Sequence, residues 1–194
     1  MTDIVVDRVS KSFGDKMVFD RYSATFRGGR MSCLMGPSGC GKTTLLHMLM
    51  GLITPDEGVI TGVPFRKSAV FQEDRLCESF HAVANVRLAC PKSTPPSVVE
   101  SHLVRIGLEG SLKLPVIRLS GGMRRRVAIV RAILAESDIV FLDEPFKGLD
   151  AITRQRVMDY VREQTAGKTV ILVTHEPAEA EAMVDDLLNV HNMH

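Results

Sequence analysis

Residues 31–50 read MSCLMGPSGCGKTTLLHMLM, and this stretch decides the fold. MSCLM is a short β-rich run that predicts a strand, whereas the residues from Gly41 onward carry apolar side chains on almost every face of a predicted helix. Between the two, residues 36–43 match the pattern GxxxxGK[ST], placed after the predicted strand and at the start of the helix. The stretch therefore predicts a phosphate-binding loop in an α/β protein.

The residue types in this loop fit the chemistry of a triphosphate. Glycines let the backbone curl so that successive amide N–H groups point inward, and the helix N-terminus adds partial positive charge. Lys42 supplies a full charge, and Thr43 offers a hydroxyl to the Mg²⁺ that bridges the phosphates. The loop residues that we expect to contact nucleotide are Gly36, Pro37, Ser38, Gly39, Cys40, Gly41, Lys42, Thr43 and Thr44.

A second part of the site is predicted at residues 139–144, IVFLDE. Continuous apolar runs of this kind are typical of parallel strands buried on both faces, and ligands bind at the carboxyl ends of such strands. We predict that Asp143 binds the metal and that Glu144 orients and deprotonates the water that attacks the γ-phosphate. Alternatively, Glu144 caps the turn at Pro145.

A second anion-binding helix start is predicted at residues 119–123, LSGGM, in a chain with one phosphate loop. Ser120, Gly121 and Gly122 expose a hydroxyl and amides at the N-terminus of a predicted helix. One nucleotide has no obvious use for both motifs within one chain. Two copies that meet face to face would place this segment on the opposite side of the triphosphate, but it could also be a simple helix cap.

Composition limits the classes of function. The 194 residues are 45% hydrophobic and 24% charged, which predicts one domain around one core. The net charge of +1 lacks the basic excess of nucleic-acid binders, so no nucleic acid is expected as a partner. The run Arg124-Arg125-Arg126 is instead expected to face solvent, a partner subunit or nucleotide. No apolar run approaches the ~18 residues that span a bilayer.

The cysteines and the amino terminus indicate a cytosolic protein. Cys33, Cys40, Cys77 and Cys90 form no CxxC pair, which fits neither a zinc site nor a disulfide framework, so reduced thiols are expected. Cys40 lies in the phosphate loop beside a lysine and a helix N-terminus, both of which favour a reactive thiolate; alternatively, it is an unreactive small residue that fills space. The first residues, MTDIVVDRVS, lack the basic-then-apolar layout of a secretory signal.

The order and spacing of these motifs resemble the ATP-binding subunit of ATP-binding cassette (ABC) transporters over nearly the whole chain. Residues 119–123 match the LSGGQ signature of that family, with Met123 in place of glutamine. The compact form and the VFQED segment are most similar to importers of the nitrate, sulfonate and taurine class. The resemblance assigns four more residues: an adenine-stacking aromatic, a metal- and membrane-sensing glutamine, a dimer-contacting aspartate and a switch histidine, namely Phe13, Gln72, Asp150 and His175.

Each of these four assignments has a plainer alternative. Phe13 could be a core residue, and Asp150 could be a helix cap before Ile152. Gln72 could end a strand on the surface, and His175 could be a hydrogen-bonded histidine at the end of a strand.

The resemblance implies a P-loop NTPase core with a mostly parallel sheet, an amino-terminal antiparallel β subdomain and an α-helical subdomain inserted at about 73–137 of a single 1–194 domain. It implies ATP and Mg²⁺ as ligands, held between two identical copies in a head-to-tail dimer. Thr43, Gln72 and Asp143 would bind the metal, and Lys42, Glu144 and His175 would be catalytic. The implied partners are integral-membrane permease subunits and an extracytoplasmic solute-binding protein, with the chain peripheral on the cytoplasmic face of the cell membrane.

The sequence departs from the family pattern at one further position, and two other functions share some of its motifs. Lys147 stands where the family usually has a small residue before Gly148, so the dimer contact there is expected to differ. A soluble ABC-type ATPase of DNA repair shares the motifs, but such proteins usually carry hundreds of residues of coiled coil between the halves of the site. A small-molecule phosphotransferase also uses a phosphate loop, but it needs a substrate lid and has no use for LSGGM.

Overall fold

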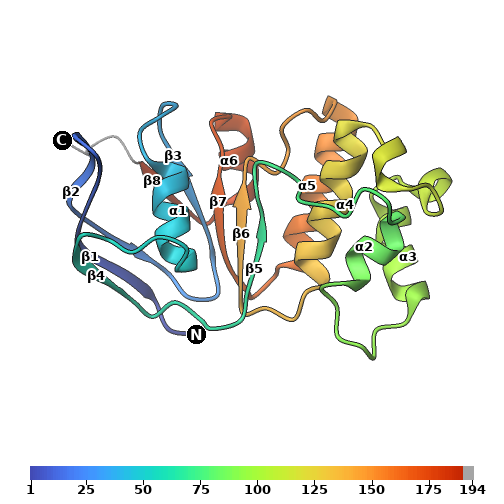
Figure 1. Cartoon of the computed structure of the whole chain (residues 1–194), viewed down its shortest axis with the longest axis horizontal. Coiled ribbons are helices and arrows are strands. Elements are labelled where there is room, and N and C mark those ends of the chain that lie inside the picture. Colours follow the sequence, from blue (N-terminus) through green and yellow to red (C-terminus); the bar gives the residue numbers. More distant parts are fainter. Residues whose placement is uncertain (190–194) are drawn as a thin grey trace.

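The computed structural model describes residues 1–189, whose strands form two sheets (Figure 1). A three-stranded antiparallel sheet has the order β2-β1-β4, and a five-stranded parallel sheet has the order β5-β6-β7-β3-β8. The strands are β1 (Ile4–Phe13), β2 (Lys16–Phe26), β3 (Met31–Met35), β4 (Glu57–Thr61), β5 (Lys67–Val70), β6 (Ile139–Asp143), β7 (Thr169–Val173) and β8 (Asp186–Asn189).

The helices gather on two sides of the parallel sheet. Helix α1 lies with the antiparallel sheet at one side, whereas α2, α3 and α4 lie at the other, in the connection between the neighbouring strands β5 and β6 (Figure 1). Within residues 1–189, no helix combines the length and apolar character needed to cross a membrane. The helices are α1 (Lys42–Met50), α2 (Ala82–Arg87), α3 (Pro96–Arg105), η1 (Glu109–Ser111), η2 (Val116–Arg118), α4 (Gly121–Leu134), α5 (Ala151–Gln164) and α6 (Pro177–Met183).

The parallel sheet is the middle layer because alternate side chains pack into two different apolar clusters. In β6, Val140 and Leu142 join the cluster that includes the buried faces of α4 and α5. Ile139 and Phe141 point the other way, into the cluster that includes α1 and the antiparallel strands. Each such fully buried side chain contributes roughly 1.5–3 kcal/mol. The continuous apolar run of β6 is therefore explained by burial on both faces.

The α/β fold with a parallel sheet and an amino-terminal antiparallel β region confirms the prediction from sequence. Helices α2, α3 and α4 fall within the predicted insertion at 73–137, whose boundaries stay a prediction, as does the single domain over 1–194. Strands β4 and β8 and helix α6 were not predicted, and α5 was considered only as the helix that Asp150 would cap. All four cysteines are free thiols.

Candidate active site

The phosphate loop connects β3 to α1, as predicted. Gly41 has a φ of +101°, and a Cβ added there would lie 2.7 Å from Cγ1 of Val18, so a side chain has neither the backbone conformation nor the space. The ammonium group of Lys42 is folded back over the loop, where its Nζ donates to the carbonyl oxygens of Gly36 at 2.7 Å and Pro37 at 2.9 Å. The loop thus presents a positive charge at the N-terminus of α1.

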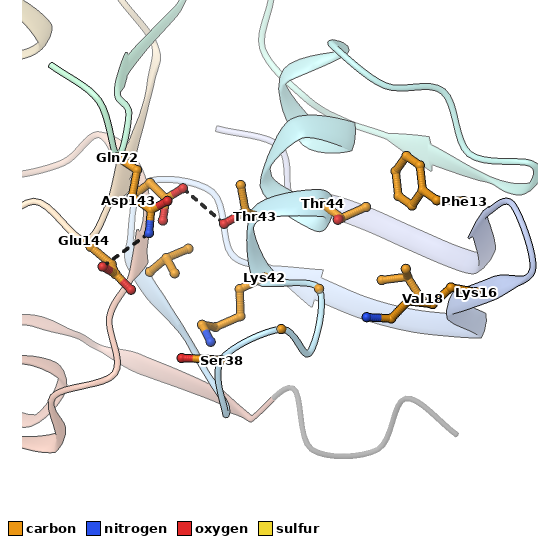
Figure 2. A pocket seen from close by; sticks show the side chains of 13 residues that line it. Phe13, Lys16, Val18, Ser38, Lys42, Thr43, Thr44, Gln72, Asp143 and Glu144 are labelled. Atoms are coloured by element: carbon orange, nitrogen blue, oxygen red, sulfur yellow. Dashed lines mark hydrogen bonds between the residues drawn. The ribbon is translucent and has the colours of Figure 1, made fainter. Parts of the chain in front are cut away.

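Oxygen atoms suited to Mg²⁺ meet at the other end of the loop. Figure 2 shows Thr43 and Asp143 pointing toward each other, and the Oγ1 hydroxyl of Thr43 donates to Oδ2 of Asp143 at 3.3 Å. Gln72 lies beside them, in the loop that follows β5. Within residues 1–189, no three His, Cys, Asp or Glu side chains form an all-protein metal cage. One hydroxyl, one carboxylate and one amide next to a phosphate loop instead fit Mg²⁺, which binds through few protein ligands plus phosphate oxygens.

Asp143 is the buried carboxylate of the site, with 2% of its surface exposed. Burial raises its pKa, the hydrogen bond from Thr43 acts in the opposite direction, and the neighbouring Glu144 raises it further. The charge on Asp143 is therefore only weakly compensated by the protein itself. A divalent cation at this position would supply the missing compensation.

Glu144 is surrounded by donors. Its Oε2 lies 2.8 Å from Nζ of Lys147, and Nε2 of Gln72 donates to the same oxygen at 3.5 Å. Nδ1 of His175 lies 3.3 Å from Oε1. Burial acts to raise the pKa of Glu144, but the hydrogen bonds from Lys147 and Gln72 and the charges of Lys147 and His175 outweigh it, so the pKa lies below its ordinary value. Glu144 is held as a carboxylate, the form that a general base requires.

Two adjoining pockets surround these residues and share Ser38 and Glu144. The first has a volume of about 420 Å³, and the second about 540 Å³. The first contains the predicted residues Phe13, Ser38, Gly39, Gly41, Lys42, Thr43, Thr44, Gln72, Asp143 and Glu144. The second contains Gly36, Pro37, Ser38, Glu144 and His175.

Phe13 lies at the opposite end of the first pocket from Asp143, with α1 and the phosphate loop between them (Figure 2). Its side of the pocket is formed by the ends of β1 and β2, and Phe13 is 49% exposed. This exposure contradicts the alternative in which Phe13 is a core residue. A half-exposed aromatic ring at the rim of a phosphate pocket offers a flat face to a base.

Sequence reasoning missed several lining residues, namely Lys16, Val18, Met35, Lys147 and Val173. Most of them belong to strands or to their ends and carry no motif. Lys147 did carry a signal, because it departs from the family pattern, but its contact with Glu144 depends on the turn that joins them. In that turn Glu144 has a φ of +47° and Gly148 a φ of +78°.

The LSGGM segment lines neither pocket. Ser120 is the N-cap of α4, and its Oγ accepts from the backbone N–H of Met123 at 3.3 Å, while Gly121 is exposed. The side chain of Met123 packs against the apolar cluster of the helical region. A Cβ added at Gly122 would lie 3.2 Å from Leu149, so this segment adjoins the loop that carries Asp150. The segment and the loop that carries Asp150 are therefore neighbours, and neither lines the two pockets around the phosphate loop.

Asp150 caps helix α5, the alternative considered for it from sequence. Its Oδ1 accepts from the backbone N–H of Thr153 at 3.0 Å. Asp150 is exposed, so a contact with a second copy is compatible with the cap.

The prediction that all three arginines after the signature face solvent, a partner or nucleotide is wrong for Arg125 and Arg126. Arg125 is buried and donates to the carbonyl oxygens of Phe71 and Gln72. Arg126 donates to the carbonyl oxygen of Ile106 at 2.8 Å and to the next one along the chain. A guanidinium has five donors in a planar fork, so loop carbonyls within reach can satisfy it inside the protein.

Comparisons with known proteins agree with this geometry. A family model described as ABC transporter matches residues 19–147. The chain is 39% identical over 188 residues to the aliphatic sulfonates import ATP-binding protein SsuB 1 of Nocardia farcinica, covering 95% of this chain and 76% of that one. It is 33% identical over 197 residues to the taurine import ATP-binding protein TauB of Escherichia coli O157:H7, covering 94% and 77%.

The solved structures agree as well. The dimeric structure of MJ0796, a bacterial ABC transporter cassette, matches with a TM-score of 0.85 at 25% identity and covers 96% of this chain and 93% of that one. The matched family model spans the phosphate loop, the LSGGM segment and the Asp143-Glu144 pair. The resemblance inferred from the motifs is confirmed: the chain belongs to the ABC transporter family, as an ATP-binding subunit and ATPase.

Proposed function

We propose that this subunit powers the import of a small organic sulfonate of the taurine type through separate membrane subunits. Support comes from the printed functions of relatives that are 33–39% identical over most of both chains. The observation that carries the hydrolytic part is the position of Glu144, whose carboxylate lies between Lys147 and His175 beside the phosphate loop.

In the proposed reaction, the loop amides and Lys42 bind the β- and γ-phosphates of ATP. Mg²⁺, when bound, would be held by Thr43, Asp143 and Gln72 and would neutralise charge on those phosphates. Glu144 accepts a proton from the attacking water, and His175, next to Glu144, holds the γ-phosphate side. Phe13 stacks on the adenine.

A second copy of the chain completes each site. Its residues 119–123 contact the triphosphate from the opposite side, and its Asp150 contacts the facing copy. The proposal is supported by the neighbouring positions of these two segments, neither of which lines the pockets around its own phosphate loop. ATP binding closes the head-to-tail dimer, and hydrolysis removes the shared ligand so that the copies separate.

The Glu144→Gln variant tests the catalytic role. Removing the general base is expected to lower ATP turnover by ~10²–10⁴ while ATP binding persists. Size-exclusion chromatography with Mg-ATP should therefore show the variant as a dimer, and phosphate release should be nearly absent. Turnover at the parental rate would contradict the role of Glu144, and a chain that never dimerises, even with its membrane subunit, would contradict the shared site. Phosphate release from the parent without an acceptor excludes a phosphotransferase.

The proposed docking surface for the membrane subunit lies in the helical region. A hollow of about 470 Å³ is lined there by residues that include Phe80, Leu88 and Arg87. Phe80 and Leu88 are 45% and 61% exposed, and their segment follows directly after the Gln72 loop. Exposed apolar side chains next to a loop of the active site suit a partner that must sense nucleotide.

Replacing Leu88 by glutamate is expected to abolish co-purification with the membrane subunit while basal ATP hydrolysis persists. The matched control is Val59→Glu, since Val59 is 50% exposed on β4, in the antiparallel sheet. Equal loss in both variants would contradict this docking surface. Recovery of a permease and a solute-binding protein from detergent-solubilised membranes, with ATP-dependent uptake of taurine into vesicles, would support import. Uptake of a different solute would contradict the sulfonate assignment alone.

A further inference from the structure

The loop after β5 is attached to one helix by a buried arginine. Nη1 of Arg125 donates to the carbonyl oxygen of Phe71, and Nη2 donates to that of Gln72, each at 2.5 Å. The same guanidinium makes an ion pair with Asp74, with Nη1 3.3 Å from Oδ1. Only 9% of the Arg125 side chain is exposed. One fork of donors therefore fixes the peptide groups on both sides of Gln72.

A second arginine of the same helix continues this attachment. Arg131 donates to the carbonyl oxygen of Arg75 at 2.7 Å and to that of Asp74 at 2.8 Å. Residues 71–75 are thus held by α4 through four backbone carbonyls. Figure 1 shows the segment that leaves β5 passing across α4. Arg126, between them in the sequence, instead holds the carbonyls after α3.

The two ends of this connection face different parts of the site. On the loop, the side chain of Gln72 lies 3.5 Å from Glu144 and lines the pocket of the chain's own nucleotide. On the helix, Arg125 comes five residues after Ser120, which caps α4 and carries the hydroxyl that would contact the nucleotide of the second copy. A shift of either end is expected to be transmitted to the other, because one nearly buried guanidinium donates to both carbonyls.

We propose that Arg125 is a positioning residue that fixes Gln72 for the metal and, through α4, links the two nucleotide sites of the dimer. This inference rests on the proposed function. Arginine suits the task because its planar fork presents several donors in one fixed geometry, whereas the ammonium group of a lysine rotates on a flexible stem and fixes two carbonyls less rigidly.

The first experiment measures magnesium dependence without measuring hydrolysis. In a Glu144→Gln background with a fixed excess of ATP, thermal unfolding is followed while MgCl₂ is titrated. Arg125→Ala is expected to raise the Mg²⁺ concentration at the midpoint roughly tenfold, the size of effect seen when a residue that orients a metal ligand is removed. The matched control is Arg126→Ala, which loses two carbonyl contacts after α3 and one to Gly122 of its own helix but none to the Gln72 loop. Its midpoint is expected to equal that of the parent.

A double-mutant cycle shows whether Arg125 acts through Gln72. Gln72→Ala alone is expected to raise the Mg²⁺ midpoint, and Arg125→Ala is expected to add nothing in that background. The inference is overturned if the Mg²⁺ midpoint of Arg125→Ala equals that of the parent, or if Arg126→Ala shifts the midpoint as much as Arg125→Ala does. Either result leaves the proposed function intact. A parental midpoint for Gln72→Ala overturns the proposed metal role of Gln72 as well.

A milder variant covers the case in which Arg125→Ala does not fold. Arg125→Lys keeps the charge but loses the planar fork of donors, so its Mg²⁺ midpoint is expected to lie between that of the parent and that of Gln72→Ala. The link between sites is tested by ATP-driven dimerisation of the same proteins in saturating Mg²⁺. The Hill coefficient for ATP is expected to fall toward 1 in the Arg125 variants and to stay at the parental value in Gln72→Ala, where α4 is still attached to the loop. A parental Hill coefficient in the Arg125 variants overturns the link.

Discussion

Replacing Asp143 by asparagine is expected to stabilise the nucleotide-free chain at neutral pH. Asp143 is 2% exposed, and within residues 1–189 the side-chain donor on its carboxylate is the hydroxyl of Thr43 at 3.3 Å. Burial raises the pKa of Asp143 above its ordinary 3.8, and Glu144 adds to the increase. The ionised carboxylate is therefore less stable in the folded chain than in the unfolded one.

The sign of the pH dependence follows from this raised pKa. Below pH 3.8, the pKa in the unfolded chain, the Asp143 carboxyl is protonated in both the folded and the unfolded chain and does not reduce the free energy of unfolding. As the pH rises through the higher pKa of the folded chain, the free energy of unfolding falls. The Asp143→Asn variant has no ionisable group at this position, so its free energy of unfolding does not fall in this way. Its stability relative to the parent therefore increases with pH and levels off above the folded pKa of Asp143. Replacing a charge of this kind at a functional site gains about 1 kcal/mol, which is roughly 2–4 °C in Tm for a domain of this size.

The assay is thermal unfolding in EDTA at several pH values between neutral and mildly acidic, repeated with Mg-ATP. Saturation at 100 times Kd stabilises the parent by about 2.7 kcal/mol, whereas the variant lacks the metal carboxylate and gains less. The order of the two Tm values should therefore reverse when Mg-ATP is added. Asp150→Asn serves as the control: Asp150 has a lowered pKa because it accepts backbone and side-chain hydrogen bonds from Thr153, so its contribution is present at neutral pH and lost on acidification. The reasoning is refuted if the Tm of Asp143→Asn does not exceed that of the parent at neutral pH, or if the difference between the two Tm values does not change with pH.

Three further predictions concern other contacts. Asn85 is fully buried, and its side-chain oxygen accepts from the backbone N–H of Cys77 at 2.7 Å. Asn85→Ala is therefore expected to lower the free energy of unfolding by roughly 1–3 kcal/mol. A urea unfolding midpoint equal to that of the parent would contradict this. N-ethylmaleimide is expected to inhibit the ATPase with protection by ATP, and Cys40→Ala should remove the sensitivity. Lys147→Ala frees an oxygen of Glu144 from a half-exposed ion pair, so kcat at saturating Mg-ATP is expected to rise by at most about fivefold. A tenfold fall in kcat would instead indicate that Lys147 contacts the phosphates of ATP during hydrolysis.

Motifs at the ends of buried strands could be located from sequence. Thr43 and Asp143 are 100 residues apart, yet they are hydrogen-bonded. Their proximity was predictable because Asp143 ends β6 and Thr43 lies just after the loop that leaves β3, and the carboxyl ends of such parallel strands meet at one edge. The helix caps at Ser120 and Asp150 were also foreseen as alternatives, since both residue types are favoured at N-caps.

Contacts decided by distant backbone could not be located in this way. Three consecutive arginines look alike in sequence, and the burial of Arg125 is decided by two carbonyls that lie 54 and 53 residues away. The edge strands β4 (EGVIT) and β8 (DLLN) mix apolar with polar or glycine residues, so neither shows the continuous apolar run that identified β6. The ion pair between Lys147 and Glu144 depends on the left-handed backbone conformation at Glu144. No sequence motif predicts that conformation.

The place of β3 in the parallel sheet has a consequence for synthesis of the chain. Strand β3, which carries the phosphate loop, pairs with β7 on one side and β8 on the other, and these strands comprise residues 169–173 and 186–189. A ribosome therefore exposes the loop well before its two supporting neighbours. Until residues 169–173 and 186–189 have been synthesised, β3 lacks both of its partner strands, so the phosphate loop has no rigid support and is not expected to bind ATP.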